Sequence, residues 1–348
     1  MRIAFFVNDI ATEYPRYTTT VLAHEALKRG HRIFYVTPDD FICRPDDRLA
    51  IRAVTPARSK FADLEAFHKH LQGCASKGKV IDMGEIDVLM LRNDPSLEMG
   101  TRPWAEQIGL MFGKLAADQG VLVLNDPDGL SRAQNKLYFQ TYPEAVRAKT
   151  LISKAEDEIK DFIRSHKGKV IVKPLQGSGG KNVFIVKSQK EQNLNQILET
   201  VSKEGYVIAQ AYLPKAVGGD IRLFVMNGEP LEVDGKYAAI RRVPAKGEVR
   251  SNMHARGKAA KAKITEQELE VAEMVRAKLV QDGMFLVGLD IVGDKILEVN
   301  VFSPGALHSC MESQGVNFAG AIIEAVERKL EVKRVYGDGI GNRELATM

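Results

Sequence analysis

The chain has 348 residues, of which 45% are apolar and 27% charged, the composition of an ordinary folded globular protein. The length predicts two or three domains and leaves ample residues for a hydrophobic core. The formal net charge of +4 is small, so we expect small anionic ligands and no nucleic-acid partner.

Features of secreted and membrane proteins are missing from the sequence. The first apolar run meets Asp9 at once, which is typical of a strand and not of a signal peptide. No stretch of about 18 apolar residues predicts a membrane span. The three cysteines, Cys43, Cys74 and Cys310, have no CxxC spacing and favour a reducing compartment, so we expect a cytoplasmic protein.

Residues 1–127 alternate between apolar strands and helical segments, which predicts an open α/β sheet. The weakly patterned stretch 40–85 is interpreted as loops and a helix. Polar residues at 92–95 and 125–129 follow predicted strands, and ligands of such sheets bind beyond the carboxyl ends of strands. The predicted strands are 2–8, 31–37, 87–92 and 121–125, and the predicted helices are 20–30 and 103–120.

The pattern changes near residue 147 to a small α+β module that ends near 210. After it, Asn227-Gly228 predicts a tight hairpin turn, and Thr265 with Glu268 has the spacing of a capping box before a helix that ends at Gly283. A further helix is predicted at 318–331, and the tail 331–348 is expected to be loose.

The stretch "GLDIVGDKILEVNVFSPG", residues 288–305, places Asp290, Glu298 and Asn300 among apolar residues of a predicted hairpin, so we expect Glu298 to be at least half-buried. A two-residue turn would set the two carboxylates on opposite faces, whereas a three-residue connection over 293–295 would set them directly across the ladder. We favour the second geometry, with a divalent cation between the like charges. The alternative is an edge hairpin with solvated acids.

The segment "KPLQGSGGKN", from Lys173 to Asn182, has three glycines in four positions and connects two predicted strands. It fits neither the Walker A pattern nor GxGxxG, and both of those lead into a helix. We interpret it as a flap whose backbone N–H groups close over a triphosphate, with Lys173 as a point charge beside it. A plain glycine-rich hairpin is the alternative.

Arginines at strand ends or in loops form a second candidate site. Arg92, Arg222, Arg242 and Arg250 have side chains whose forked geometry suits carboxylates and phosphates. A substrate with several carboxylates would need several of them. For any single arginine, a solvated basic loop is the plainer interpretation.

Five stretches, in this order, carry a resemblance to a known family: "KPLQGSGG", "AQAYLP", "GGDIRLFVMNGEP", "RRVPAKGEVRSN" and "VGLDIVGDKILEVNVFSP". The chain resembles the prokaryotic-type glutathione synthetases of the ATP-grasp superfamily over residues 1–330. The resemblance implies an N-terminal α/β substrate domain (1–127), an ATP-grasp lid module that moves (128–210) and a catalytic domain (211–330).

The resemblance also implies a site in which ATP lies between two sheets. Lys173, Arg222 and Arg242 would be catalytic. ATP would be bound at its phosphates by Lys136, Lys173 and the loop Gly177, Ser178, Gly179 and Gly180, with further contacts from Gln210, Ala211, Tyr212, Leu213 and Asp220. Two Mg²⁺ ions, with Mn²⁺ as the alternative, would be held by Asp290, Glu298 and Asn300. The acid and the transferring phosphoryl group would contact Arg92, Arg222, Arg242, Arg250 and Asn252, and the amine would lie beside Ser303 and Pro304.

The expected activity is ATP-dependent ligation of γ-glutamylcysteine and glycine through an acyl phosphate, in a homo-oligomer of two or four subunits. One departure stands out, because better-known members carry threonine after Ser-Pro and an acidic residue soon after, whereas this chain has Gly305 to Cys310. Two alternatives remain: a ligase of the same family with another acid or amine, and an ATP-binding regulatory protein without catalysis. Cys310 need not be catalytic, and His308 is expected to be structural.

Overall fold

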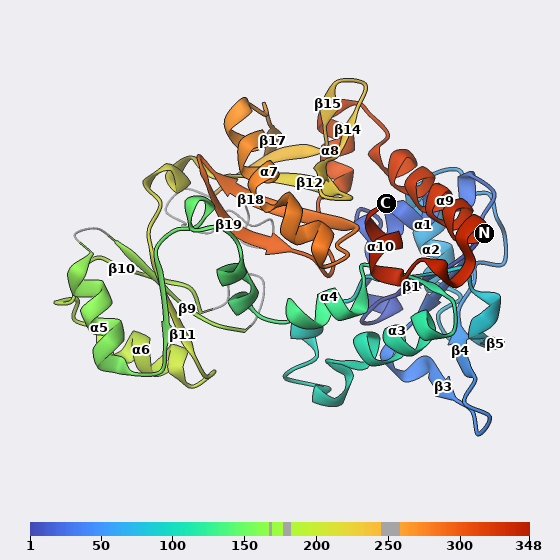
Figure 1. Cartoon of the computed structure of the whole chain (residues 1–348), viewed down its shortest axis with the longest axis horizontal. Helices are drawn as coiled ribbons and strands as arrows, with labels where there is room; N and C mark the ends of the chain where they lie inside the picture. Colours follow the sequence, from blue (N-terminus) through green and yellow to red (C-terminus); the bar gives the residue numbers. More distant parts are fainter. Residues whose placement is uncertain (167–168, 177–181, 245–257) are drawn as a thin grey trace.

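The computed structural model describes residues 1–166, 169–176, 182–244 and 258–348, apart from the side chain of Asp338. These residues form five sheets with α-helices and short 3-10 turns packed around them (Figure 1). The 3-10 turns are η1 (Ile10–Thr12), η2 (Pro38–Asp40), η3 (Met83–Glu85), η4 (Pro95–Leu97), η5 (Pro103–Ala105), η6 (Lys136–Thr141), η7 (Glu144–Val146), η8 (Pro214–Gly218) and η10 (Gly337–Gly339).

The N-terminal sheet is parallel, with strand order β2-β1-β6-β7, as the α/β pattern predicted. Its strands are buried almost throughout, because helices cover a parallel sheet on both faces. The elements are β1 (Arg2–Phe6), α1 (Thr18–Lys28), β2 (Arg32–Val36), β6 (Val88–Leu91), α3 (Ile108–Asp118), β7 (Leu122–Leu124) and α4 (Pro127–Arg132).

The stretch 40–85 contains more structure than the sequence predicted. The expected helix exists, but the expected loops include an antiparallel sheet of order β3-β4-β5. Only β4 is mostly buried. The strands β3 and β5 are short, and their residues are half-buried or exposed, so neither has the alternation that marks a strand. The elements are β3 (Phe41–Cys43), β4 (Leu49–Ala53), α2 (Leu64–Gln72) and β5 (Lys79–Asp82).

A second unit forms the arm at the left of Figure 1. It is an antiparallel sheet of order β10-β9-β11-β8 whose apolar residues pack with those of two helices into a core of their own. The elements are β8 (Thr150–Ser153), α5 (Glu156–Ser165), β9 (Val170–Pro174), β10 (Phe184–Val186), α6 (Leu194–Ser202) and β11 (Val207–Ala211). After the role that the resemblance implies for residues 128–210, we refer to this unit as the lid sheet.

The third unit is the sheet β17-β16-β12-β18-β19, in which β13 also pairs with β12. The tight turn predicted at Asn227-Gly228 is confirmed, since both residues have positive φ, of 55° and 83°. The capping box of Thr265 and Glu268 is confirmed too. The elements are β12 (Asp220–Met226), β13 (Glu229–Pro230), β14 (Glu232–Val233), β15 (Lys236–Tyr237), β16 (Ala239–Val243), β17 (Lys258–Lys261), α7 (Glu266–Gln281), β18 (Leu286–Val292) and β19 (Lys295–Asn300). β14 and β15 pair with each other in a separate two-stranded sheet. After the role that the resemblance implies for residues 211–330, we refer to the larger sheet as the catalytic sheet.

The C-terminal segment is ordered, so the prediction of a loose tail was wrong. It forms α10, and Leu345 and Ala346 are buried against α7, α9 and β7. Asn342 Nδ2 donates to Val123 O (3.0 Å) and to Asp126 Oδ2 (2.8 Å). The partners lie far away in sequence, which is why the local pattern did not reveal them. The helices are α8 (Leu307–Gln314), α9 (Phe318–Tyr336) and α10 (Asn342–Thr347).

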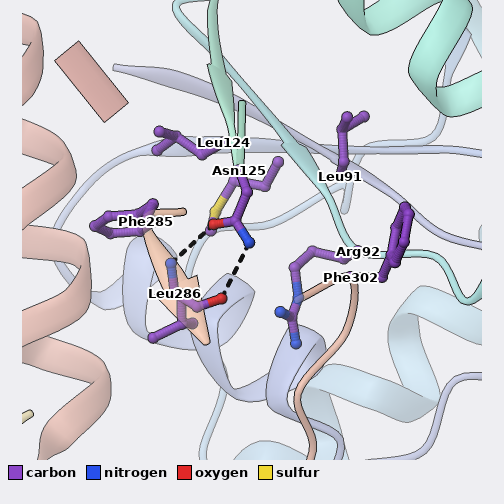
Figure 2. Close-up of a pocket in the computed structure, with 8 residues that line it drawn as sticks. Leu91, Arg92, Leu124, Asn125, Phe285, Leu286 and Phe302 are labelled. Carbon is purple, nitrogen blue, oxygen red and sulfur yellow. Dashed lines mark hydrogen bonds between the residues drawn. The ribbon is translucent and has the colours of Figure 1, made fainter. Parts of the chain in front are cut away.

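Asn125, at the end of β7, joins the N-terminal sheet to the catalytic sheet (Figure 2). Its Nδ2 donates to Leu286 O (3.1 Å) and Val301 O (2.6 Å), and its Oδ1 accepts from Leu286 N (2.8 Å). The predicted polar segment after this strand therefore satisfies backbone groups at the start of β18 and just after β19. Among the residues described, no helix combines the length and apolarity needed to cross a bilayer.

Candidate functional site

The hairpin of β18 and β19 places Asp290 directly across from Glu298, as predicted, although the expected turn was wrong. The turn has two residues, since Val292 pairs with Lys295 across it. The register then shifts between Asp290 and Ile291, so that Leu297 is an extra residue in β19. This β-bulge, and not a longer turn, brings the two carboxylates to opposite positions of the ladder.

Asp290 is 2% exposed, and two arginines compensate its charge. Arg222 is bidentate, with Nε 2.5 Å from Oδ1 and Nη2 3.0 Å from Oδ2. Arg242 Nη2 lies 2.6 Å from Oδ2 and also binds Asp220. Burial alone would raise the pKa of Asp290, but the two guanidinium groups outweigh it and hold the pKa below its ordinary value.

Glu298 is exposed, so the expectation that it would be at least half-buried was wrong. The bulge turns Ile296 into the core and leaves the carboxylate at the surface. Asn300 Nδ2 donates to Asp290 Oδ2 and to Gly288 O, both at 3.3 Å. Asp290, Glu298 and Asn300 thus gather at one end of the hairpin.

The donor set of this hairpin fits a hard divalent cation. It offers two carboxylates and, after rotation of the Asn300 amide, a carbonyl oxygen, with room for ligands from outside the chain. Among the described residues, no group of three or more His, Cys, Asp or Glu side chains gathers as a metal cage. A cation held here would therefore take its remaining ligands from water or from a bound phosphate.

Two lysines face this hairpin from the lid side. Lys173, on β9, donates to Gln210 Oε1 (3.2 Å), and Lys136 N donates to Leu175 O (3.2 Å). Burial lowers the pKa of Lys173 to about 8; Lys136 also lowers it, and Glu298 opposes the shift. Burial lowers the pKa of Lys136 as well, again opposed by Glu298. The fold thus brings both predicted phosphate-binding lysines into the electrostatic reach of one predicted metal ligand.

The predicted adenine-binding residues span the connection from the lid sheet to the catalytic sheet. Gln210 and Ala211 end β11, and Tyr212 and Leu213 follow. Gln210 is buried, and its Nε2 donates to Thr150 Oγ1 (3.1 Å). Other predicted site residues lie outside the described residues: Gly177, Ser178, Gly179, Gly180, Arg250 and Asn252.

The loop before α8 is held by two of the arginines that were predicted to bind substrate. Arg222 Nη1 donates to Gly305 O (3.0 Å), and Arg92 Nη2 donates to Pro304 O (3.2 Å). Ser303 is exposed and Pro304 is buried. Ala306 has a positive φ of 84°, which an alanine adopts only at a cost. The departure at residues 305–310 therefore spans the end of this loop and the first turn of α8, and the loop is held by Arg92 and Arg222.

Arg92 is 4% exposed and lies beside Phe302 and Asn125 in the narrow gap between the N-terminal and catalytic sheets (Figure 2). Its Nε is 3.4 Å from Thr19 Oγ1. Burial lowers its pKa to about 10, against the attraction of Glu13. The contacts of Arg92 in this structure are with the protein, and its role toward a substrate stays a prediction.

Sequence reasoning missed Glu13, a buried carboxyl that interacts with Thr20 and Arg92. Burial raises its pKa to about 7, opposed by a hydrogen bond from Thr20 and by the charge of Arg92. The one signal in the sequence was its place in the loop after the first strand, at the carboxyl edge of the sheet.

Two sheets that enclose lysines and paired carboxylates define an ATP-grasp fold, and solved structures share it. The D-cycloserine synthetase DcsG matches with a TM-score of 0.63 and 15% identity, covering 94% of this chain and 99% of that chain. The D-alanyl-alanine synthetase A of Vibrio cholerae matches with a TM-score of 0.57 and 13% identity, covering 95% and 98%. The predicted fold class, an N-terminal α/β domain followed by an ATP-grasp fold, is confirmed.

Family models identify the particular family. The models of the prokaryotic glutathione synthetase N-terminal domain and ATP-grasp domain match residues 1–131 and 135–315. A glutathione synthetase of Vibrio vulnificus is 31% identical over 89% of this chain and 92% of its own length; one of Brucella melitensis biotype 1 is 32% identical over 90% and 93%. The chain belongs to the prokaryotic glutathione synthetase family and is an ATP-dependent ligase that forms C–N bonds. Membership implies small-molecule substrates, ATP and a divalent metal.

Proposed function

We propose that the protein joins γ-glutamylcysteine to glycine with ATP, giving glutathione, ADP and phosphate. The observation that carries the proposal is the Asp290–Glu298 pair, set across one ladder and faced by Lys136 and Lys173. Membership in the family supports this choice of acid and amine, since the glutathione synthetases align over nearly the whole chain.

The proposed reaction has two steps. The substrate carboxylate attacks the γ-phosphorus of ATP, forms an acyl phosphate and releases ADP. The amine then attacks the acyl carbon, forms the amide and releases phosphate. Negative charge shifts among phosphoryl oxygens throughout, and Lys136, Lys173, Arg222 and Arg242 are the described cations placed to stabilise it.

The divalent metal is proposed to be Mg²⁺, with Mn²⁺ as the alternative, as two ions held by Asp290, Glu298 and Asn300. A bound divalent ion neutralises phosphate charge and orients the γ-phosphoryl group. The side-chain oxygens of the hairpin would hold the metal, and phosphate oxygens of the nucleotide would supply further ligands.

The remaining contacts are proposals that rest on the family resemblance. ATP is proposed to lie between the lid sheet and the catalytic sheet, with closure of the lid excluding water from the acyl phosphate. The domain limits at 127, 210 and 330, a homo-oligomer and a cytoplasmic location remain proposals. The residues assigned are Gly177, Ser178, Gly179, Gly180, Gln210, Ala211, Tyr212, Leu213 and Asp220 for ATP, and Arg92, Arg250, Asn252, Ser303 and Pro304 for the acid and the amine.

The test is a product assay with purified protein, ATP and Mg²⁺. With γ-glutamylcysteine and glycine, we expect glutathione and ADP in equal amounts, and no ADP above background when either substrate is omitted. Absence of turnover with this pair would reject the assignment.

A second candidate function is ligation of another acid or amine by the same chemistry. The observation that favours it is the segment from Gly305 to Cys310, at the start of α8, which departs from the better-known members where the amine is expected to enter. A panel of dipeptide acids and amino acids, scored by ADP release, separates the two. Faster turnover of an amine other than glycine would favour this candidate.

A further inference from the structure

The 3-10 turn η6 begins with Lys136 and precedes the lid sheet in the chain. Asn135 closes the turn, since its Oδ1 accepts from Leu137 N (3.0 Å) and its backbone O accepts from Tyr138 N (3.2 Å). Lys136 N donates to Leu175 O (3.2 Å), just after β9 of the lid sheet. The position of the Lys136 backbone therefore depends on how this turn is held.

A buried aspartate fixes the other side of the turn to α7. Tyr138 is 6% exposed, and its OH donates to Oδ2 of Asp282 (2.8 Å), the residue that follows α7. Asp282 is fully buried and is also paired with Arg132 Nη1 (2.8 Å) and Lys278 Nζ (2.7 Å). A hydrogen bond to a buried carboxylate is stronger than one between neutral groups, so the Tyr138 hydroxyl anchors the turn firmly.

Lys136 and Tyr138 leave the turn in different directions. A 3-10 helix has about three residues per turn, so residues two positions apart point about 120° away from each other. Tyr138 contacts Asp282, whereas Lys136 Nζ is 3.5 Å from Leu175 O and within the electrostatic reach of Glu298. Burial lowers the pKa of Lys136, because it disfavours the charged amine. The turn therefore has to hold this amine in place against its preference for water.

We propose that Tyr138, held by Asp282, is a positioning residue for nucleotide binding, because it fixes η6 so that the Lys136 amine reaches the phosphates of ATP. The inference rests on the proposed function, in which Lys136 contacts phosphate. Tyr138 acts through Lys136 and does not itself touch ATP. Removal of its hydroxyl should loosen the turn, so that ordering the turn and the lysine costs more entropy when ATP binds.

The test is a double-mutant cycle of Tyr138→Phe and Lys136→Met. The quantity measured is the Kd of a non-hydrolysable ATP analogue with Mg²⁺, by isothermal titration calorimetry. Tyr138→Phe removes only the hydroxyl and should raise the Kd about five-fold. In the Lys136→Met background, the same substitution should change the Kd by less than about two-fold, because the amine that the turn positions is gone.

Steady-state kinetics adds a second readout, which a general weakening of the fold would not reproduce. In Tyr138→Phe, KM for ATP should rise about five-fold, while KM for the acid and KM for the amine stay within about two-fold of wild type.

Arg132→Gln is the matched control. It removes a partner of Asp282 that lies on α4, outside the turn. The Kd of the analogue should stay within about two-fold of wild type in this variant. Tyr138→Phe leaves Asp282 paired with Arg132 and Lys278, so the variant should fold, and urea unfolding of both variants measures what each substitution costs the fold.

An equal rise of the Kd on Tyr138→Phe in both backgrounds, or a rise as large in Arg132→Gln, would overturn the inference, since Asp282 and the hydroxyl would then support the fold in general. An unchanged Kd in Tyr138→Phe, where Lys136→Met weakens binding, would overturn it too. Both results leave the proposed function intact. If Lys136→Met binds the analogue as tightly as wild type, the proposed phosphate contact of Lys136 fails and the inference falls with it.

Discussion

At the scale of single residues, the central feature is a buried aspartate whose charge needs compensation. The sequence showed the need, because Asp290 stands in an apolar strand, but it suggested only a cation between carboxylates. The structure supplies Arg222 and Arg242 from the neighbouring strands β12 and β16. Which arginine reaches which acid depends on strand order, which residue spacing does not encode.

Glu298→Gln should lower ATP-dependent turnover by about 100-fold or more, because a neutral amide is a poor ligand for a divalent cation. The free energy of unfolding should change by less than about 0.5 kcal/mol, since Glu298 is exposed. Asp294→Asn, at an exposed acid in the turn of the same hairpin, is the matched control and should retain activity. Unchanged turnover in Glu298→Gln would show that the metal site lies elsewhere.

The pH dependence of ATP use should report Lys173. Burial lowers its pKa to about 8, so the side chain is charged below pH 8 and loses its proton above it. Only the charged form attracts phosphate, and kcat/KM for ATP should therefore fall as the pH rises through about 8. Lys173→Arg keeps its charge and should extend the plateau to higher pH. If kcat/KM for ATP decreases over the same pH range in wild type and in Lys173→Arg, another titrating group causes the decrease.

At the scale of elements, the hairpin shows how far sequence reasoning reached. Apolar content predicted two strands, and the expectation of a cation between like charges favoured a three-residue turn that sets Asp290 across from Glu298. The reason was wrong, because a one-residue bulge at Leu297 replaces the longer turn. A bulge leaves the composition of a strand unchanged, so only the pairing reveals it. Likewise, Asn125 was expected near a ligand and instead binds backbone groups of another sheet.

Asn125→Ala should destabilise the protein by about 3 kcal/mol or more, because it leaves buried backbone groups of Leu286 and Val301 without partners. Urea unfolding of the purified variant measures the change. Asn193→Ala is the control: this exposed residue precedes α6 and makes no capping hydrogen bond through its side chain. If Asn125→Ala loses no more free energy of unfolding than the control, the hydrogen bonds of Asn125 between the two sheets do not stabilise the fold.

At the scale of the whole molecule, the order of the units along the chain could be predicted, but the contacts between segments far apart in sequence could not. The α/β pattern over 1–127 and the change of pattern near 147 predicted separate sheets. The small sheet β3-β4-β5 and the docked helix α10 were missed, because their stability comes from segments far away in the chain. The binding roles predicted for the glycine loop and for Arg250 and Asn252 stay predictions, because these residues lie outside the described part of the chain.

Leu345→Ala should lower the free energy of unfolding by about 2–4 kcal/mol, since its side chain is 1% exposed and its removal leaves a cavity beside α7 and α9. Leu97→Ala, at an exposed leucine, should change it by less than about 0.5 kcal/mol. Thermal or urea unfolding of the two variants compares them. Equal free energies of unfolding for Leu345→Ala and Leu97→Ala would indicate that the C-terminal segment is loose, as the sequence had suggested.

The most direct test of the account is an isotope-transfer measurement on the wild-type protein. The substrate is γ-glutamylcysteine labelled with ¹⁸O at both oxygens of the carboxylate that becomes the amide. It is incubated with ATP, Mg²⁺ and glycine, and the ¹⁸O content of the released phosphate is measured by mass spectrometry. Attack of that carboxylate on the γ-phosphorus predicts one labelled oxygen in each phosphate, in step with the glutathione formed. Phosphate that carries no label would contradict the account.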